Sequence, residues 1–205
     1  MRKCYIFGSA EISDYGSIKV EADSFVIAAD GGYRHTIRLG LLPDLLIGDF
    51  DSLEGEPPLR CETITAPKEK DDTDMLLAVK AAMGRGFYDI TLCGASGGRF
   101  DHTIANLQVL EYILSKGGKG RIIEPSFEAY VLSKGSFDFP GNSGYLSMFA
   151  ISEEAVVTTC GTKYNVENYK LTRSFPVGVS NEMTAASCNI TIHHGTLLII
   201  LQNNS

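Results

Sequence analysis

Apolar and polar positions alternate in two different ways along this chain of 205 residues. In the first part, buried strands are predicted at the short apolar runs 4–7, 25–29, 45–47, 63–65 and 90–93. Apolar residues at helical spacing predict helices over residues 73–83, with Leu76, Val79 and Met83 facing inward, and over residues 102–115. Buried strands that alternate with helices are typical of an α/β fold with an open, mostly parallel sheet and flanking helices.

The pattern changes near Pro125, and no convincing helical period follows it. Short apolar segments occur at residues 129–132, 145–150, 155–159, 188–192 and 197–201. Polar, glycine-containing turns are expected between them at residues 140–144 and 193–195. This pattern predicts an antiparallel β-domain, a sandwich or a barrel, and we take the sandwich as the expectation. The predicted domains are residues 1–124, with an α/β fold, and residues 125–205, a β-sandwich.

Acidic residues follow the carboxyl ends of four predicted strands: Asp30, the pair Asp49 and Asp51, Asp74, and Asp101. In an open parallel sheet these ends share one edge, where ligands bind. Some of the acids have an ordinary structural reading, because Asp72 or Thr73 can cap the helix that begins near Asp74, and Asp101 can cap the helix that begins near His102. Asp49 and Asp51 fit capping less well, and their alternation puts both carboxylates on one side of an extended segment.

Converging carboxylates repel one another unless a cation lies among them, and Mg²⁺ is the expected occupant. Lys70 and Arg99 lie in the same loops and suit a polyphosphate. The glycine-rich run 94–98, which contains Ser96, is expected to bring backbone N–H groups close to phosphate. The chain lacks G-x-x-x-x-G-K-[ST] and a G-x-G-x-x-G after its first strand, which disfavours P-loop NTPases and NAD dehydrogenases.

Composition narrows the class of protein further. A formal net charge of −7 disfavours a general nucleic-acid binder. No apolar stretch approaches the ~18 residues of a membrane span, so no membrane association is expected. The five cysteines are widely spaced and odd in number, which indicates reduced thiols in a cytoplasmic protein.

Four segments resemble, in order, the signature series of the thiamine pyrophosphokinase family. They are residues 29–32 (ADGG), 43–52 (PDLLIGDFDS), 70–74 (KDDTD) and 97–102 (GGRFDH). Residues 161–164 (GTKY) and 180–182 (SNE) resemble the family's later motifs. The likeness runs from about residue 28 to the C-terminus, and the ordered set is far more specific than any one motif.

The resemblance implies an enzyme that transfers the diphosphate group of ATP to the hydroxyl of thiamine and releases AMP. It also implies a homodimer with an active site between subunits, in which residues 1–124 are the catalytic domain that binds MgATP and residues 125–205 bind thiamine and form the dimer. Carried over by motif, Asp49, Asp51 and Asp74 are the expected Mg²⁺ ligands. The residues expected around the polyphosphate are Asp30, Lys70, Thr73, Ser96 and Arg99. Those expected near thiamine are Asp101, Ser180, Asn181 and Glu182, with Asp101 orienting the reacting hydroxyl.

The sequence departs from the family pattern on the thiamine side. Thr162 stands where leucine is usual, Met183 where phenylalanine is common, and Tyr164 where some members carry tryptophan. Two other readings stay open at this point. One is a different Mg²⁺-dependent phosphotransferase or phosphohydrolase on the same scaffold, and the other is a non-catalytic sensor of thiamine or nucleotide.

Overall fold

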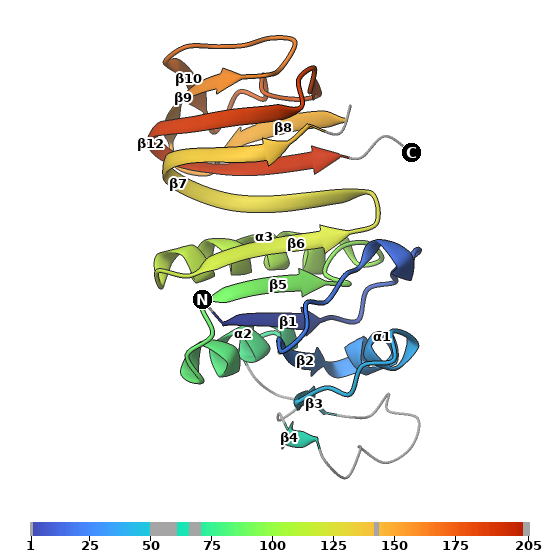
Figure 1. Cartoon of the computed structure of the whole chain (residues 1–205). Coiled ribbons are helices and arrows are strands. Elements are labelled where there is room, and N and C mark those ends of the chain that lie inside the picture. Colours follow the sequence, from blue (N-terminus) through green and yellow to red (C-terminus); the bar gives the residue numbers. More distant parts are fainter. Residues whose placement is uncertain (1, 50–60, 66–70, 142–143, 203–205) are drawn as a thin grey trace. The chain divides into compact units, whose positions relative to one another are not determined.

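A computed structural model of the chain describes residues 2–49, 61–65, 71–141 and 144–202 (Figure 1). Two predicted site residues, Asp51 and Lys70, lie outside the described residues. The chain divides into two compact units, Met1–Pro125 and Ser126–Ser205.

The described strands of the first unit form one parallel sheet, ordered β6-β5-β1-β2-β3-β4. The strands are β1 (Lys3–Phe7), β2 (Phe25–Ala29), β3 (Leu45–Gly48), β4 (Glu62–Thr65), β5 (Asp89–Cys93) and β6 (Lys119–Glu124). Arrowheads of β1, β2, β5 and β6 point the same way in Figure 1. The α/β prediction is confirmed, and β6 is the strand that it missed.

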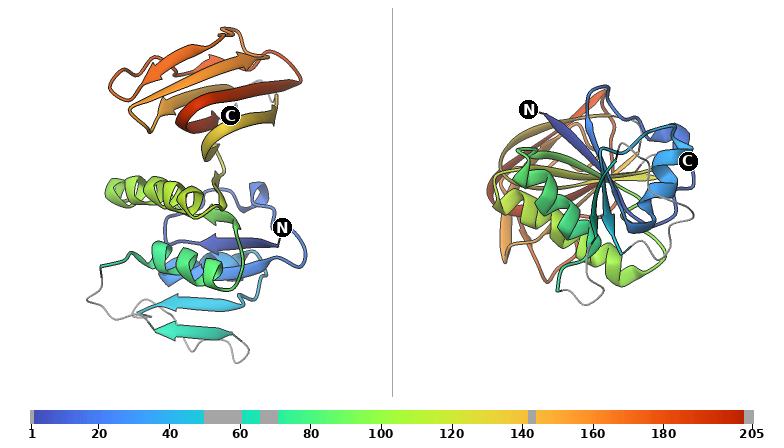
Figure 2. Two further views of the ribbon diagram at one scale, coloured as in Figure 1. Left: turned by 90° about the vertical axis from the view of Figure 1, so that its left-hand side faces the viewer. Right: turned by 90° about the horizontal axis from the view of Figure 1, so that it is seen from below.

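Two helices, α2 (Asp74–Gly84) and α3 (Phe100–Ser115), lie side by side against this sheet (Figure 2). Val79 and Met83 of α2 are buried as predicted, but Leu76 is only half-buried and Met75 takes its place in the core. Of the helices that the structure describes, none has the length and apolar character of a membrane span.

Three shorter helical segments precede α2: η1 (Tyr15–Ser17), η2 (Asp30–Gly32) and α1 (Tyr33–Arg38). The turn η2 follows β2 directly and runs into α1. A Cβ atom on Gly32 would lie 1.9 Å from the carbonyl oxygen of Phe7. Only glycine therefore lets this turn pack against the end of β1.

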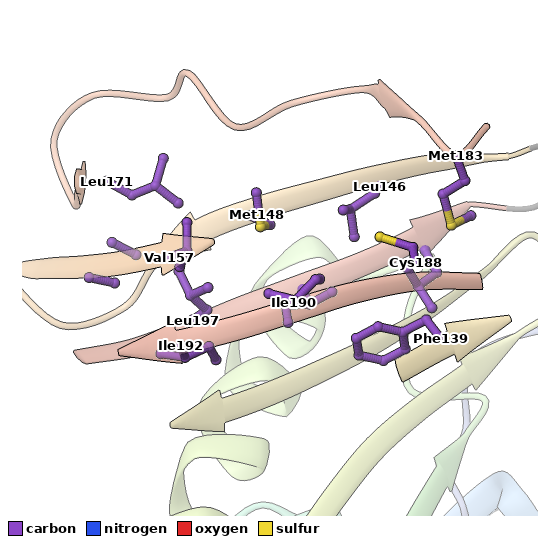
Figure 3. Packing of buried hydrophobic residues seen from close by; sticks show 14 residues of the cluster. Phe139, Leu146, Met148, Val157, Leu171, Met183, Cys188, Ile190, Ile192 and Leu197 are labelled. Carbon is purple, nitrogen blue, oxygen red and sulfur yellow. The ribbon is translucent and has the colours of Figure 1, made fainter. Parts of the chain in front are cut away.

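The second unit is antiparallel throughout its described strands. They are β7 (Phe127–Pro140), β8 (Tyr145–Ala150), β9 (Glu154–Cys160), β10 (Tyr169–Thr172), β11 (Asn181–Glu182) and β12 (Ser187–Gln202). Long β12 pairs with β7 along most of its length, with β9 through its first half and with β8 through its second. Apolar side chains from these strands meet in a buried core, where Leu146, Ile190 and Leu197 have no exposed surface (Figure 3).

The prediction of a hairpin turn at residues 193–195 is wrong. The chain continues through it as one strand, and the register slips between Ile192 and Thr196. Gly195 has a φ of +81°, and a Cβ atom there would lie 2.3 Å from the carbonyl oxygen of Glu154. The irregularity is a β-bulge, and the same strand pairs with β9 before it and with β8 after it.

Candidate active site

A cavity of about 380 Å³ lies at the carboxyl ends of β1, β2 and β5. Its walls are the loop after β1, the turn after β2, the start of α2 and the glycine-rich loop before α3. Asp30, Asp74 and Arg99, predicted from separate segments of the sequence, all line it. Acids that follow different strands thus meet at one sheet edge, as the position rule for parallel sheets requires.

Gly94 brings two walls of the cavity together. Its carbonyl accepts a hydrogen bond of 3.0 Å from the N–H of Ala10. Its φ is +59°, and a Cβ atom there would lie 2.8 Å from the carbonyl oxygen of Gly8. A larger residue would therefore push the loop after β1 away from the loop after β5.

Asp30 begins η2 with a φ of +50°, a conformation that aspartate tolerates better than most residues. The hydroxyl of Ser9 donates to its Oδ2 atom at 3.2 Å. From the next strand, Gly48 approaches so closely that a Cβ atom would lie 3.1 Å from Cα of Asp30. Asp49 follows Gly48 and is half-buried, although it does not line the cavity itself.

Thr73 and Asp74 lie at the start of helix α2 and have different roles there. The Thr73 hydroxyl caps the helix by accepting a hydrogen bond of 3.2 Å from the N–H of Leu76. Asp74 lies in the first turn, and both residues line the cavity. Asp72, just before them, pairs instead with Lys80 at 2.6 Å. The capping alternative is confirmed for Thr73 and is wrong for Asp101, because α3 has Arg99 at its N-cap position and Asp101 already lies inside the first turn.

Arg99 and Asp101 form a two-pronged ion pair at the start of α3. Nε of Arg99 donates to Oδ1 of Asp101 at 3.2 Å, and Nη2 donates to Oδ2 at 2.5 Å. The guanidinium lowers the pKa of the Asp101 carboxyl, which makes it a weaker proton acceptor. Both side chains are mainly exposed, so the pair adds little stability. Arg99 lines the cavity, whereas Asp101 does not.

The glycine-rich loop directs three of its backbone N–H groups to side-chain acceptors. Ala95 and Ser96 donate theirs to Oε1 of Glu124, at 2.8 and 3.0 Å. Gly97 donates its N–H to the hydroxyl of Thr103 at 3.2 Å. These three donors bond within the protein, and the expectation that the run 94–98 brings backbone N–H groups close to a phosphate stays a prediction. Ser96 itself is half-buried and does not line the cavity.

His35 is a buried residue of the short helix α1. Its Nε2 atom lies 2.8 Å from the carbonyl oxygen of Ala10, and its Nδ1 lies 2.6 Å from the Tyr15 hydroxyl. Because a carbonyl only accepts, Nε2 carries the proton and Nδ1 accepts from Tyr15. Burial lowers the pKa of His35, which keeps the ring neutral. The neutral ring holds the loop after β1 in place beside the cavity.

In the second unit, Ser180 and Asn181 hold neighbouring segments together. The N–H of Ser180 donates to the Ser147 hydroxyl at 3.0 Å. Asn181 accepts from the N–H of Tyr164 at 3.0 Å and donates to the carbonyl of Tyr164 at 2.8 Å and to the Thr162 hydroxyl at 3.1 Å. Asn181 therefore fixes the segment 162–164, which carries two of the departures from the family pattern.

A second hollow, of about 270 Å³, lies beside this network. Asn181 and the largely exposed ring of Tyr164 line it, together with apolar residues such as Val179. Glu182 pairs with Lys163, whose Nζ lies 3.1 Å from both carboxylate oxygens. The hollow offers an aromatic face with polar groups at its rim, which suits a flat, partly polar ligand.

The carboxylates near the first cavity are of the kind that binds a divalent cation. Within residues 2–49, 61–65, 71–141 and 144–202, no three His, Cys, Asp or Glu side chains gather as a metal-binding group. Asp30 and Asp74 line one cavity, and Asp49 follows the glycine that packs on Asp30. Such oxygen donors fit a hard divalent ion, which usually keeps waters and binds through one or two carboxylates plus substrate phosphates.

Comparisons with known proteins agree along the length of the chain. A family model described as "Thiamin pyrophosphokinase, catalytic domain" matches residues 19–120, and "Thiamin pyrophosphokinase, vitamin B1 binding domain" matches residues 137–197. Thiamine pyrophosphokinase of Bacillus subtilis (strain 168) is 30% identical over 183 residues, which is 85% of this chain and 85% of the relative. Thiamin pyrophosphokinase 1 of Caenorhabditis elegans is 22% identical over 174 residues, 78% of this chain and 72% of the relative.

Solved structures extend the likeness to the fold. The crystal structure of thiamine pyrophosphokinase from Bacillus subtilis matches with a TM-score of 0.89 and 25% identity, covering 100% of both chains. Thiamin pyrophosphokinase from Candida albicans matches with a TM-score of 0.75 over 98% of this chain and 89% of that one. At 17% identity, the second match is a likeness of fold alone.

Proposed function

The chain belongs to the thiamine pyrophosphokinase family, and from this premise we propose that ATP binds in the cavity at the edge of the parallel sheet. The chain is an ATP-dependent diphosphotransferase that converts thiamine to thiamine diphosphate. The observation that carries the placement is that Asp30, Asp74 and Arg99 line one cavity although they come from three separate segments. A cavity with carboxylates on one wall and a guanidinium on another suits a metal-bound polyphosphate.

We assign Mg²⁺ as the divalent ion, held by Asp49, Asp51 and Asp74. The ion would neutralise charge on the phosphate oxygens when bound. Around the polyphosphate we place Asp30, Lys70, Thr73, Ser96 and Arg99. Thr73 acts through its cap, which fixes the first turn of α2 and with it Asp74. Ser96 acts through the backbone of its loop, since its N–H bonds to Glu124.

In the proposed reaction the hydroxyl oxygen of thiamine attacks the β-phosphorus of ATP. The bond from that phosphorus to the oxygen bridging the α-phosphate breaks, and AMP leaves. Alignment and charge neutralisation carry such transfers. The proton of the hydroxyl passes to solvent water. Asp101 orients the hydroxyl and Arg99 and is a weak proton acceptor, because the Arg99 guanidinium lowers its pKa.

The products test this reaction directly. Purified protein incubated with ATP, Mg²⁺ and thiamine should yield AMP and thiamine diphosphate in equal amounts, separated by chromatography. ADP with thiamine monophosphate would contradict attack at the β-phosphorus. Binding of thiamine without any product would favour the sensor reading instead.

On the thiamine side, we propose that Ser180, Asn181 and Glu182 meet the aminopyrimidine at a site shared between two subunits of a homodimer. The hollow beside Asn181 and Tyr164 supports a flat ligand there. The partners are then ATP, thiamine and a second copy of the chain. We also propose a cytoplasmic location, supported by five free thiols; recovery in the soluble fraction of lysed cells would check it.

A shared site predicts complementation between two inactive variants. Asp74→Asn and Asn181→Ala, co-expressed with different tags, should form mixed dimers in which one site carries both changes and the other neither. Random pairing then restores about a quarter of wild-type activity. Asp74→Asn with Arg99→Ala is the matched control. Both changes lie in the first unit, so each active site of a mixed dimer carries one of them and none is wild type. Equal recovery in both pairs, or none in either, would rule out the shared site.

A further inference from the structure

Glu124, the last residue of β6, is a buried carboxylate that the proposed reaction does not use. Only 5% of its surface is exposed, and its Oε1 atom accepts both the Ala95 and Ser96 N–H groups. Burial raises the pKa of Glu124, while the bonds from Ala95 and Ser96 oppose that shift. Burying a carboxylate lowers the stability of the fold unless hydrogen bonds offset the loss of hydration. Packing alone therefore does not account for this residue.

Asn106 holds the same peptide segment from the opposite side. It lies on α3, is 7% exposed, and donates its Nδ2 to the carbonyl of Ala95 at 2.7 Å. Ala95 is thus bonded through its N–H to β6 and through its C=O to α3. Two residues after Ala95, the N–H of Gly97 donates to the hydroxyl of Thr103 on α3.

These bonds fix a wall of the cavity that ends at Arg99. Gly94, Ala95, Gly97, Gly98 and Arg99 all line the cavity. The same wall is joined to the loop after β1 by the bond between Gly94 and Ala10. Between Gly94 and Arg99 the loop contains two glycines with positive φ, Gly97 at +93° and Gly98 at +64°, so it has little stiffness of its own.

We propose that Glu124 is a positioning residue for diphosphate transfer: it holds the backbone of residues 95–98 so that Arg99 faces the polyphosphate. Asn106 assists from α3. The inference rests on the proposed placement of ATP in this cavity. The positioning role requires an acceptor oxygen and not a negative charge, because both N–H groups donate to a single oxygen atom of Glu124. An amide oxygen can accept the same two bonds.

Glu124→Gln and Glu124→Leu separate the acceptor from the charge. Leu removes the acceptor at similar size and leaves the buried N–H of Ala95 and the half-buried N–H of Ser96 without it. We therefore expect KM for ATP to rise and kcat to fall, each by about tenfold or more. KM for thiamine should stay within about twofold. Gln should restore both constants to within about threefold of wild type. Glu111→Leu, an exposed carboxylate on α3, is the control for a general effect of the substitution.

Each result has a definite meaning. Wild-type constants in Glu124→Leu would overturn the positioning role, and a Gln variant as impaired as Leu would overturn the acceptor argument. If the Leu variant does not fold by circular dichroism, Asn106→Ala replaces it, and unchanged ATP constants there would overturn the proposal. Arg99→Ala distinguishes a failure of the proposed ATP site from a failure of the Glu124 proposal. If Arg99→Ala leaves kcat and KM for ATP unchanged, ATP does not bind in this cavity as proposed. If Arg99→Ala impairs these constants while Glu124→Leu does not, only the positioning role of Glu124 is overturned.

Discussion

Asp74→Asn should lower kcat by about 10³-fold at saturating Mg²⁺ while the protein stays folded. The change keeps the size and one oxygen of the side chain but removes the negative charge that holds the metal in the proposed site. Metal-based charge stabilisation contributes several kcal/mol to a transition state, and each ~1.4 kcal/mol corresponds to tenfold in rate. Asp74 lines the cavity in the first turn of α2, so its carboxylate is placed for that task. Steady-state rates of AMP formation would measure the effect.

The structure offers a matched control two residues away. Asp72→Asn removes a carboxylate that pairs with Lys80 and does not line the cavity, so kcat should stay within about twofold. The melting temperature should change little in both variants, because Thr73 still caps α2. Near-normal turnover of Asp74→Asn would remove this carboxylate from the metal site.

The meeting of Asp30 and Asp74 could be predicted from sequence because it depends on local patterns. A short apolar run identifies a buried strand, and parallel strands end at a common edge. Nothing further was needed to expect both carboxylates in one place, and both line the cavity. The role of Thr73 was also readable, since a threonine before an apolar helical pattern is a cap signal.

Glu124 was missed because its partners lie 28 and 29 residues away. A contact of that kind depends on β6 pairing with β5, which no local pattern reports. A signal was nevertheless present: Gly120, Ile122 and Glu124 alternate as the buried positions of a strand. A charged residue at an inward position of an alternating run indicates a buried carboxylate that needs a partner.

The bulge in β12 was mistaken for a turn for a related reason. His193, His194 and Gly195 interrupt an alternating apolar pattern, and Gly195 has the positive φ that turns also use. A bulge and a turn look the same over three residues. They differ in whether the strands on either side pair with each other or with common neighbours, and here both halves pair with β7.

Arg99→Lys should lower kcat by about tenfold to a hundredfold, although the positive charge is kept. Asp101 takes the Nε–H of Arg99 and one Nη2–H, and the guanidinium has three further N–H donors. An arginine can therefore be held by Asp101 and still face a phosphate with a planar pair of donors. A lysine has one nitrogen for both tasks, so it must give up either the orientation or the phosphate contact.

The measurement for Arg99→Lys is kcat and KM for ATP at fixed Mg²⁺, with Arg85→Lys as the matched control. Arg85 pairs with Glu62 and bonds to the carbonyl of Ala81, and it does not line the cavity. We therefore expect its kcat to stay near wild type. An unchanged kcat in Arg99→Lys would exclude a transition-state role for the guanidinium. A raised KM with unchanged kcat would assign Arg99 to ground-state binding of ATP, because only interactions that strengthen in the transition state raise the rate of a bound substrate.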